Sequence, residues 1–437
     1  MATAELFQNV NALTGLVENL KHFADASDVF YLVVMGALVF IMQWGFAMLE
    51  GGQARTKNVN NVMMKNILDF MVGGPLWLFV GYCIATYGLG FGDWATWYKH
   101  VFDASASSSH NGLVMAEWFF GLVFCATTAT IISGGVAERI NFLAYVFLSV
   151  IVTGLLYPIW VHLGPWGANI LPYHDYAGSL NVHALGGAIG LGAIIALGPR
   201  IGRFKIKDGK RIPIPIPGHD VPMAIFGAFC LAFGWYGFNV GSSIFLKDIS
   251  GLVAVTTTMA MCAGAISAMV VSHFDPLATA NGFLAGLVAI CSGTDVVSPF
   301  GALIIGLVAG AQVPIVFSLV EKLGIDDACG IFPVHFGGGA TGAILAGVFG
   351  MKALGGLGGV NLGWQIIAVV LCLVYGVVVG YIAAKVAGFL AGGLRVPVEW
   401  EQEGLDITEH HLKAYHMEDP VSPVAYEKAK QEGKIVA

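Results

Sequence analysis

Apolar segments of about twenty residues recur along the chain and constrain its fold more than any other feature. A transmembrane helix needs about 20 mostly apolar residues to cross the hydrocarbon core of a bilayer. The sequence therefore predicts an all-α polytopic membrane protein with eleven transmembrane helices, of which the eighth has the weakest signal. The eleven segments lie at 28–50, 62–88, 114–136, 142–163, 179–198, 221–243, 251–272, 278–294, 299–318, 332–351 and 363–391.

Composition agrees with this class. Hydrophobic residues make up 57% of the 437 residues and charged residues only 11%, whereas soluble domains carry about 25% charged residues. These values exclude a soluble globular protein, a disordered chain and a nucleic-acid-binding protein. The seven cysteines are scattered without a C-x-x-C pair, so we interpret them as small core residues, with no disulfide framework and no metal site.

Basic residues indicate how the chain is oriented, because cytoplasmic loops carry an excess of Lys and Arg. The loops after the first and fifth apolar segments are basic, and the loops on the other side are poor in such residues. We therefore predict an external N-terminal segment (1–27), a transmembrane domain (28–393) and a cytoplasmic tail (394–437) in the inner cell membrane. The basic residues are Arg55, Lys57, Arg200, Arg203, Lys205, Lys207, Lys210 and Arg211.

Residues 175–190 and 327–342 form an internal repeat. Eight of their sixteen positions are identical, including Asp175 with Asp327 and His183 with His335. The two copies open the fifth and tenth predicted helices, which run in opposite directions in the predicted topology. The sequence thus predicts two inverted five-helix repeats and a final long helix. Transporters with this plan place their substrate path where the repeats meet.

Both copies of the repeat contain Gly-x-x-x-Gly, a spacing that lets helix backbones approach closely. If the fifth and tenth helices cross at these glycines, His183 and His335 meet inside the membrane. Each histidine could instead simply bond a backbone carbonyl. We favour a functional pair, because ionisable side chains in a membrane are costly and usually functional. The glycines are Gly186 with Gly190 and Gly338 with Gly342.

Asp175 and Asp327 lie eight residues before the two histidines. A carboxylate at a helix N-terminus satisfies free backbone N–H groups and complements the helix dipole. We therefore interpret both as structural caps, with Asp327 as the symmetry mate of Asp175. The alternative for Asp175 is a direct role in attracting a cation.

Six further segments, together with the paired histidine motifs, resemble the ammonium transporter family (Amt/Mep/Rh), and the Amt branch in particular. The likeness covers almost the whole chain. The segments are GFAMLEGGQARTKNVNNVMMKNILDF (45–70), SGGVAERINF (133–142), GPRIGRF (198–204), GWYGFNVGS (234–242), ANGFLAGLVAI (280–290) and GLRVPVEWEQEGLDITEH (393–410).

This resemblance implies a homotrimer with one narrow apolar pore in each subunit. His183 and His335 would line the pore as a proton-relaying twin-histidine pair, and Phe124 and Phe238 would close its outer mouth. Trp235 would line the inner pore. Ser242, Asp175 and Trp166 would recruit ammonium at an outer vestibule.

The chain departs from the family pattern at the vestibule. The family carries its vestibule tryptophan soon after a histidine, in a pattern like YPxxxHWxW, whereas Trp166 stands later, in YPIWVHLGPWGAN. Gly121 occupies a position where many members carry Gln, and Gly330 replaces a common Asp. These departures leave open two functions: an ammonium transporter, or an ammonium sensor of the same fold with little conduction.

The expected function is ammonium transport, in which ammonium loses its proton and ammonia passes the pore. Potassium matches ammonium in charge and size but cannot deprotonate, so an apolar barrier blocks it. We expect no enzymatic activity and no cofactor, because two histidines without a neighbouring Cys or Glu are a poor metal site. The family also implies a cytoplasmic PII-type signal protein as a partner of the basic 200–211 loop and the tail.

Overall fold

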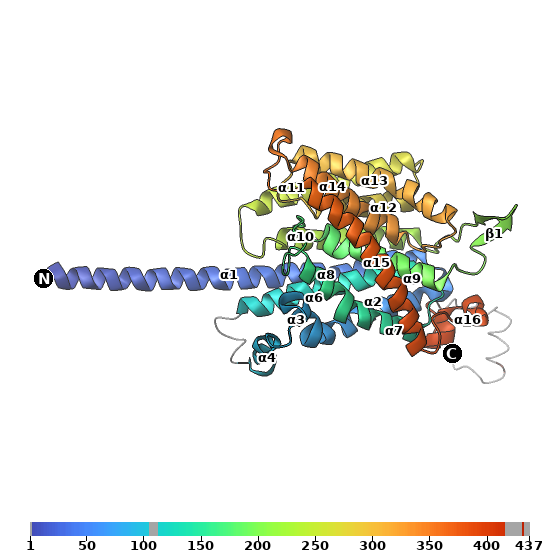
Figure 1. The fold of residues 1–437 in the computed structure, drawn as a ribbon, viewed down its shortest axis with the longest axis horizontal. Helices are drawn as coiled ribbons and strands as arrows, with labels where there is room; N and C mark the ends of the chain where they lie inside the picture. Colours follow the sequence, from blue (N-terminus) through green and yellow to red (C-terminus); the bar gives the residue numbers. More distant parts are fainter. Residues whose placement is uncertain (1, 105–111, 416–430, 432–437) are drawn as a thin grey trace.

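The computed structural model describes residues 2–104, 112–415 and 431 and shows a bundle of long helices (Figure 1). Most of the predicted tail beyond residue 415 therefore lies outside the described residues. The described helices are α1 (Ala2–Gln53), α2 (Val59–Leu76), α3 (Tyr82–Tyr87), α4 (Trp94–Phe102), α6 (Gly112–Val136), α7 (Phe142–Ile151), α8 (Tyr157–Leu163), α9 (Leu185–Leu197), α10 (Val221–Gly241), α11 (Ile249–Val271), α12 (Pro276–Ile290), α13 (Pro299–Lys322), α14 (Gly338–Phe349), α15 (Leu362–Leu390), α16 (Val398–Glu403) and α17 (Leu405–His410).

Short turns of other helix types interrupt or join these helices. Four are π-helical, in which each backbone hydrogen bond spans one residue more than in an α-helix. Such π-bulges occur frequently at functional sites. The π-helical turns are η2 (Trp77–Gly81), η3 (Val152–Leu156), η4 (Ser179–Ala184) and η5 (Phe332–Gly337), and the 3-10 turns are η1 (Thr56–Asn58) and η6 (Lys352–Leu354).

Ten helical segments within the described residues are long and apolar enough to cross a membrane. The predicted eighth span, 278–294, is helix α12, which has only 15 residues. At a rise of about 1.5 Å per residue, this helix is shorter than a bilayer core of about 30 Å. The structure thus shows a multi-span membrane protein with about ten spans. It does not establish the predicted total of eleven.

The predicted external segment 1–27 is continuous with the first apolar span. Both belong to helix α1, which runs unbroken for 52 residues. Figure 1 shows its N-terminal part projecting beyond the rest of the bundle, and residues 9–14 and 16–26 are exposed. No helix end therefore marks residue 27.

The two copies of the internal repeat pack directly against each other. A side chain at Gly187 would place its Cβ 2.6 Å from the backbone nitrogen of Phe336, and one at Gly339 would strike the carbonyl oxygen of Ser179. The crossing therefore depends on Gly187 and Gly339.

The expected contact through the Gly-x-x-x-Gly pairs is confirmed only for Gly190, where a Cβ would strike Cδ1 of Ile331 in the second copy. Gly186 packs against Thr128 and Ile131 of α6, and Gly342 packs against Ala289 of α12. The three other glycines of these pairs permit close helix approach to α6 and α12.

The basic 200–211 loop contains an antiparallel hairpin, β1 (Phe204–Lys207) and β2 (Lys210–Pro213), in which Phe204 pairs with Pro213. The described part of the tail folds back onto the bundle. Asp406 of α17 accepts hydrogen bonds from the backbone nitrogens of Asn60 (3.1 Å) and Asn61 (2.9 Å). The tail therefore caps the N-terminus of α2, which leaves free N–H groups of its own.

Candidate functional site

The two repeat histidines meet in the interior of the bundle. The Nδ1 atoms of His183 and His335 are 3.3 Å apart, and their ring planes are 18° from parallel. Both side chains are buried, with exposed fractions of 0% and 4%. At this separation one ring nitrogen donates and the other accepts. The Nε2 atom of His183 is buried and has no hydrogen-bond partner among the described residues.

Local folding of the repeat fixes where these histidines point. Each lies in a π-helical turn, His183 in η4 and His335 in η5. Asp175 accepts hydrogen bonds from the backbone nitrogens of Leu180 (2.9 Å) and Asn181 (2.8 Å). Asp327 accepts the equivalent bonds from Ile331 and Phe332 (3.0 and 2.8 Å). Equal capping of both turns explains why the two copies share their Asp-to-His spacing.

These capping aspartates are themselves buried. Burial raises the pKa of the Asp175 carboxyl from 3.8 to about 6, and the backbone N–H groups of Asn181 and Leu180 limit the rise. The pKa of Asp327 is raised to about 6 for the same reasons. Both carboxyls remain mainly ionised at neutral pH. The side chain of Asp175 is used as a cap, although its backbone oxygen also accepts a hydrogen bond from the Trp166 indole (2.8 Å).

Two phenylalanine rings lie next to the histidine pair. Phe124 of α6 and Phe238 of α10 stack with ring centroids 3.9 Å apart and planes 13° from parallel. Phe238 also lies 5.3 Å from the His183 ring. Both phenylalanines are buried. A small molecule that moves from Phe124 toward the histidines must therefore displace these rings or pass between them.

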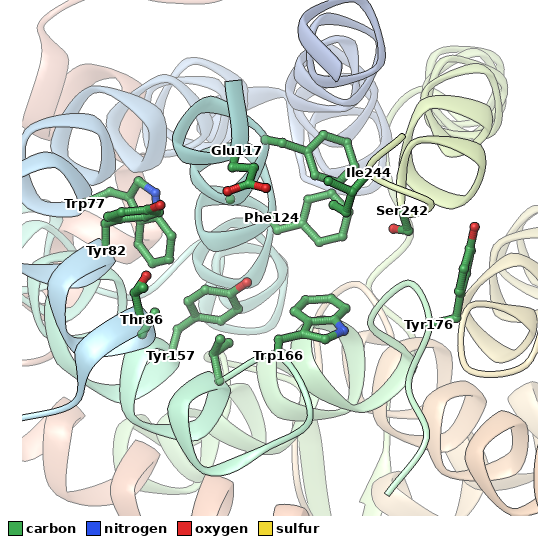
Figure 2. Close-up of a pocket in the computed structure, with 14 residues that line it drawn as sticks. Trp77, Tyr82, Thr86, Glu117, Phe124, Tyr157, Trp166, Tyr176, Ser242 and Ile244 are labelled. Carbon is green, nitrogen blue, oxygen red and sulfur yellow. The ribbon is translucent and has the colours of Figure 1, made fainter. Parts of the chain in front are cut away.

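A cavity of about 390 Å³ lies on the other side of Phe124 (Figure 2). Trp166 and Ser242 both line it. Trp166 reaches Phe124 in an edge-on contact with centroids 5.7 Å apart, so the displaced tryptophan lies at this cavity despite its unusual spacing. The hydroxyl of Ser242 donates to the Phe238 carbonyl (2.8 Å), which leaves its oxygen lone pairs available to a guest.

Trp235 lies at the pair of histidines, away from the cavity. Its ring stacks on His183 with centroids 5.0 Å apart, and it is fully buried. Its Nε1–H points to the sulfur of Cys291 (3.0 Å), whose own thiol points to the Asn239 side chain (3.1 Å). These contacts hold the indole flat against the imidazole.

Other cavity residues were not among the predicted site residues. Trp77, Tyr82, Glu117 and Tyr157 line the cavity together with Trp166 and Ser242. Gly121, which departs from the family pattern, also lines this cavity. Among the described residues, no group of three or more His, Cys, Asp or Glu side chains is placed to hold a metal ion.

Comparison with known proteins gives one consistent result. Residues 29–415 match the model of the Ammonium Transporter Family. Ammonium transporter Amt2 of Methanocaldococcus jannaschii is 61% identical over 415 residues, which cover 95% of this chain and 97% of that one. Ammonium transporter Amt1 of the same organism is 43% identical, over 91% of this chain and 99% of that one. Among solved structures, one titled Sensor Amt Protein superposes with a TM-score of 0.80 at 28% identity, over 89% of this chain and 99% of that one.

Proposed function

This chain belongs to the ammonium transporter family, and from that premise we propose that it carries ammonium across a membrane through its own pore. Ammonium enters the cavity of Figure 2 and gives up a proton, which the histidine pair receives. Ammonia then passes Phe124 and Phe238 and moves along His183 and His335.

One observation carries this proposal most directly. The cavity, the stacked phenylalanines and the histidine pair follow one another without a gap, since Phe124 contacts both the cavity and Phe238, and Phe238 contacts His183. The unpartnered Nε2 of His183 provides a hydrogen-bonding group beyond the rings. A buried polar atom without a partner costs free energy that a small hydrogen-bonding guest can recover.

The barrier separates ammonium from potassium by chemistry. Moving an intact charge through the bilayer centre costs at least about 2.5–3.5 kcal/mol, and the two phenylalanine rings replace only part of the hydration that the ion loses. Ammonia is neutral and avoids this cost, whereas potassium cannot. The histidine pair, joined by one N–H···N hydrogen bond, relays the proton that ammonium gives up: one ring accepts it and the other ring releases a proton on the inner side, so one charge crosses with each ammonia.

The remaining residues support this path. Ser242 accepts a hydrogen bond from ammonium, and the Trp166 ring attracts the cation by about 0.5–2 kcal/mol. Asp175 and Asp327 act mainly as caps that orient the histidines, although the negative charge of Asp175 also favours a cation nearby. Trp235 packs beside the histidines as the inner pore lining.

We extend the proposal to the whole assembly. Helix α12, the eighth span in order, crosses the membrane despite its short length and brings the total to eleven. The two five-helix repeats are inverted relative to each other. Three copies of the chain form a homotrimer. The N-terminal segment 1–27 lies outside, residues 28–393 form the transmembrane domain, and the tail from 394 is cytoplasmic. The hairpin and tail would then meet a cytoplasmic PII-type signal protein. The asymmetry of Lys and Arg between loops and the family resemblance support these points.

Current across a solid-supported membrane tests the central proposal. Purified protein in liposomes should give an ammonium-triggered current and no current with potassium.

Replacing both histidines, as His183→Leu with His335→Leu, should abolish ammonium flux or let potassium through, because the polar relay is gone. Unchanged ammonium-selective flux in this double variant, with intact assembly on size exclusion, would refute the role of the pair. A pH-sensitive dye inside the liposomes reports flux that carries no net charge.

A second candidate function is an ammonium sensor, and the likeness to the solved sensor structure favours including it. A sensor binds ammonium with little turnover. Its current would be a brief transient whose decay does not change with the lipid-to-protein ratio. A transporter instead gives a decay that depends on this ratio, so one experiment separates the two functions.

A further inference from the structure

The cavity has a second polar side that the proposed path does not use. We propose that Glu117, with the aromatic rings of Trp77, Tyr82 and Tyr157, forms a separate cation-binding site for ammonium and its alkylated forms. We call this group of four residues the Glu117 cage. The assignment of its natural ligand rests on the proposed function, but binding to the cage can be measured without transport.

Three rings enclose one end of the cavity. Trp77 contacts Tyr82 in an edge-on geometry and Tyr157 in a tilted one, each with ring centroids 5.9 Å apart. All three rings are buried and line the cavity. The faces of aromatic rings attract cations, and groups of such rings are used to bind quaternary and methylated ammonium ions.

Glu117 supplies a negative charge to this enclosure. Its side chain projects from α6 into the cavity and lies between Trp77 and Tyr82 on one side and Phe124 on the other (Figure 2). Within the described residues, its carboxylate makes no hydrogen bond and no ion pair. An acid that is only partly exposed in an aromatic pocket, without a partner, is suited to an incoming cation.

The cage is distinct from the recruitment residues assigned above. Figure 2 shows Trp77, Tyr82 and Thr86 on the opposite side of the cavity from Ser242 and Tyr176, with Phe124 between the two sides.

The cavity volume of about 390 Å³ is many times the share of one water molecule in the liquid, about 30 Å³. An ammonium ion is about as large as water, so the cavity has room for alkyl groups.

Local sequence explains why the cage exists in this chain. A Cβ at Gly121 would lie 2.8 Å from Cζ2 of Trp77, so the indole occupies the space of the missing side chain. Trp77 opens π-turn η2, Tyr157 directly follows π-turn η3, and the two turns pack against each other. The glycine and the paired π-turns together place the two rings at the cavity.

Binding of tetramethylammonium tests the cage. The probe is titrated into purified protein while the intrinsic tryptophan fluorescence is followed, with Glu117→Gln as the test variant and Asp248→Asn as the matched control. Asp248 is an exposed acid at the start of α11 that makes no cap hydrogen bond. Glu117→Gln should raise the dissociation constant about tenfold, since it removes the nearest charge while keeping the side-chain shape. Asp248→Asn should change it less than about twofold.

A second variant tests the aromatic part. Gly121→Gln fills the space of the Trp77 ring, so it should abolish saturable tetramethylammonium binding while the protein elutes as wild type on size exclusion. Equal dissociation constants for wild type, Glu117→Gln and Asp248→Asn would overturn the cage, as would the absence of saturable binding to wild type.

Transport is measured on the same samples, so that the two proposals fail separately. If Glu117→Gln weakens saturable tetramethylammonium binding but the wild-type protein gives no ammonium current, transport is refuted and the cage remains supported. If the wild-type protein gives a normal ammonium current but Glu117→Gln does not change tetramethylammonium binding, the cage is refuted and transport remains supported.

Discussion

At the scale of single residues, a buried group of ion pairs forms around Glu138, which lies between α6 and α7. Glu138 accepts from Arg200 (2.7 Å) and from Arg55 (3.0 Å), and Arg200 also donates to Asp326 (2.8 Å). Burial alone would raise the pKa of Glu138, but the two arginines outweigh burial and lower it from 4.5 to about 2. The pKa of Asp326 is lowered as well, because Arg139 and Arg200 outweigh its burial.

These depressed pKa values predict acid sensitivity. A carboxyl whose pKa is lower in the folded state stabilises the protein above its unfolded pKa, and this stability is lost as the pH falls through the folded value. Glu138 should therefore contribute about 3 kcal/mol that disappears between about pH 4.5 and pH 2. The thermal unfolding midpoint in detergent should fall over this range.

The variant Glu138→Gln should lower the midpoint at pH 7 and flatten its fall in acid, because the charge that titrates is gone. Glu399→Gln, at an exposed position of α16, is the control and should behave as wild type. An acid profile of Glu138→Gln that matches wild type would contradict the assigned pairing.

At the scale of elements, the meeting of the histidines depends on how closely the two repeat copies approach. Gly187 faces the backbone of Phe336, the residue after His335. A backbone neighbour cannot rotate away as a flexible side chain can. Any side chain at Gly187 should therefore push η5 outward and separate the two imidazoles.

We predict that Gly187→Ala destabilises the protein by about 1–3 kcal/mol, the usual cost of overfilling a packed interior, and reduces ammonium flux. Gly251→Ala in α11 is the matched control, since a Cβ there has no atom within 4 Å. It should keep wild-type flux and an equal or higher unfolding midpoint. Equal midpoints and fluxes for the two variants would show that the crossing tolerates a side chain.

At the scale of the whole molecule, the hairpin and the tail lie on one side of the predicted topology and the α10–α11 loop on the other. Cysteine labelling can test this, because Cys262 is the only one of the seven cysteines with an exposed side chain. In a Cys262→Ser background, Asp208→Cys in the hairpin should react with an impermeant maleimide only from the cytoplasmic side. Lys247→Cys should react only from outside. The reverse pattern would overturn the predicted orientation.

Much of the fold could be predicted because its signals are local or repeated. Runs of apolar residues identify membrane helices since a bilayer demands that length. The matched Asp and His of the two repeat copies identify a symmetric pair, and the structure brings His183 and His335 together. The weak eighth segment was the exception, since its helix α12 is only 15 residues long.

The sequence by itself determined the membrane class, the repeat, the histidine pair and the family, because each follows from composition, spacing or motif. Only the tertiary structure decided which glycines make the crossing, that Trp166 reaches the cavity, and that Glu117 lines the same cavity as Trp77, Tyr82 and Tyr157. The physical reason is that helices such as α6 are apolar on all sides, so their periodicity does not show which face meets which neighbour. Those contacts join residues far apart in the chain, and packing in three dimensions selects them.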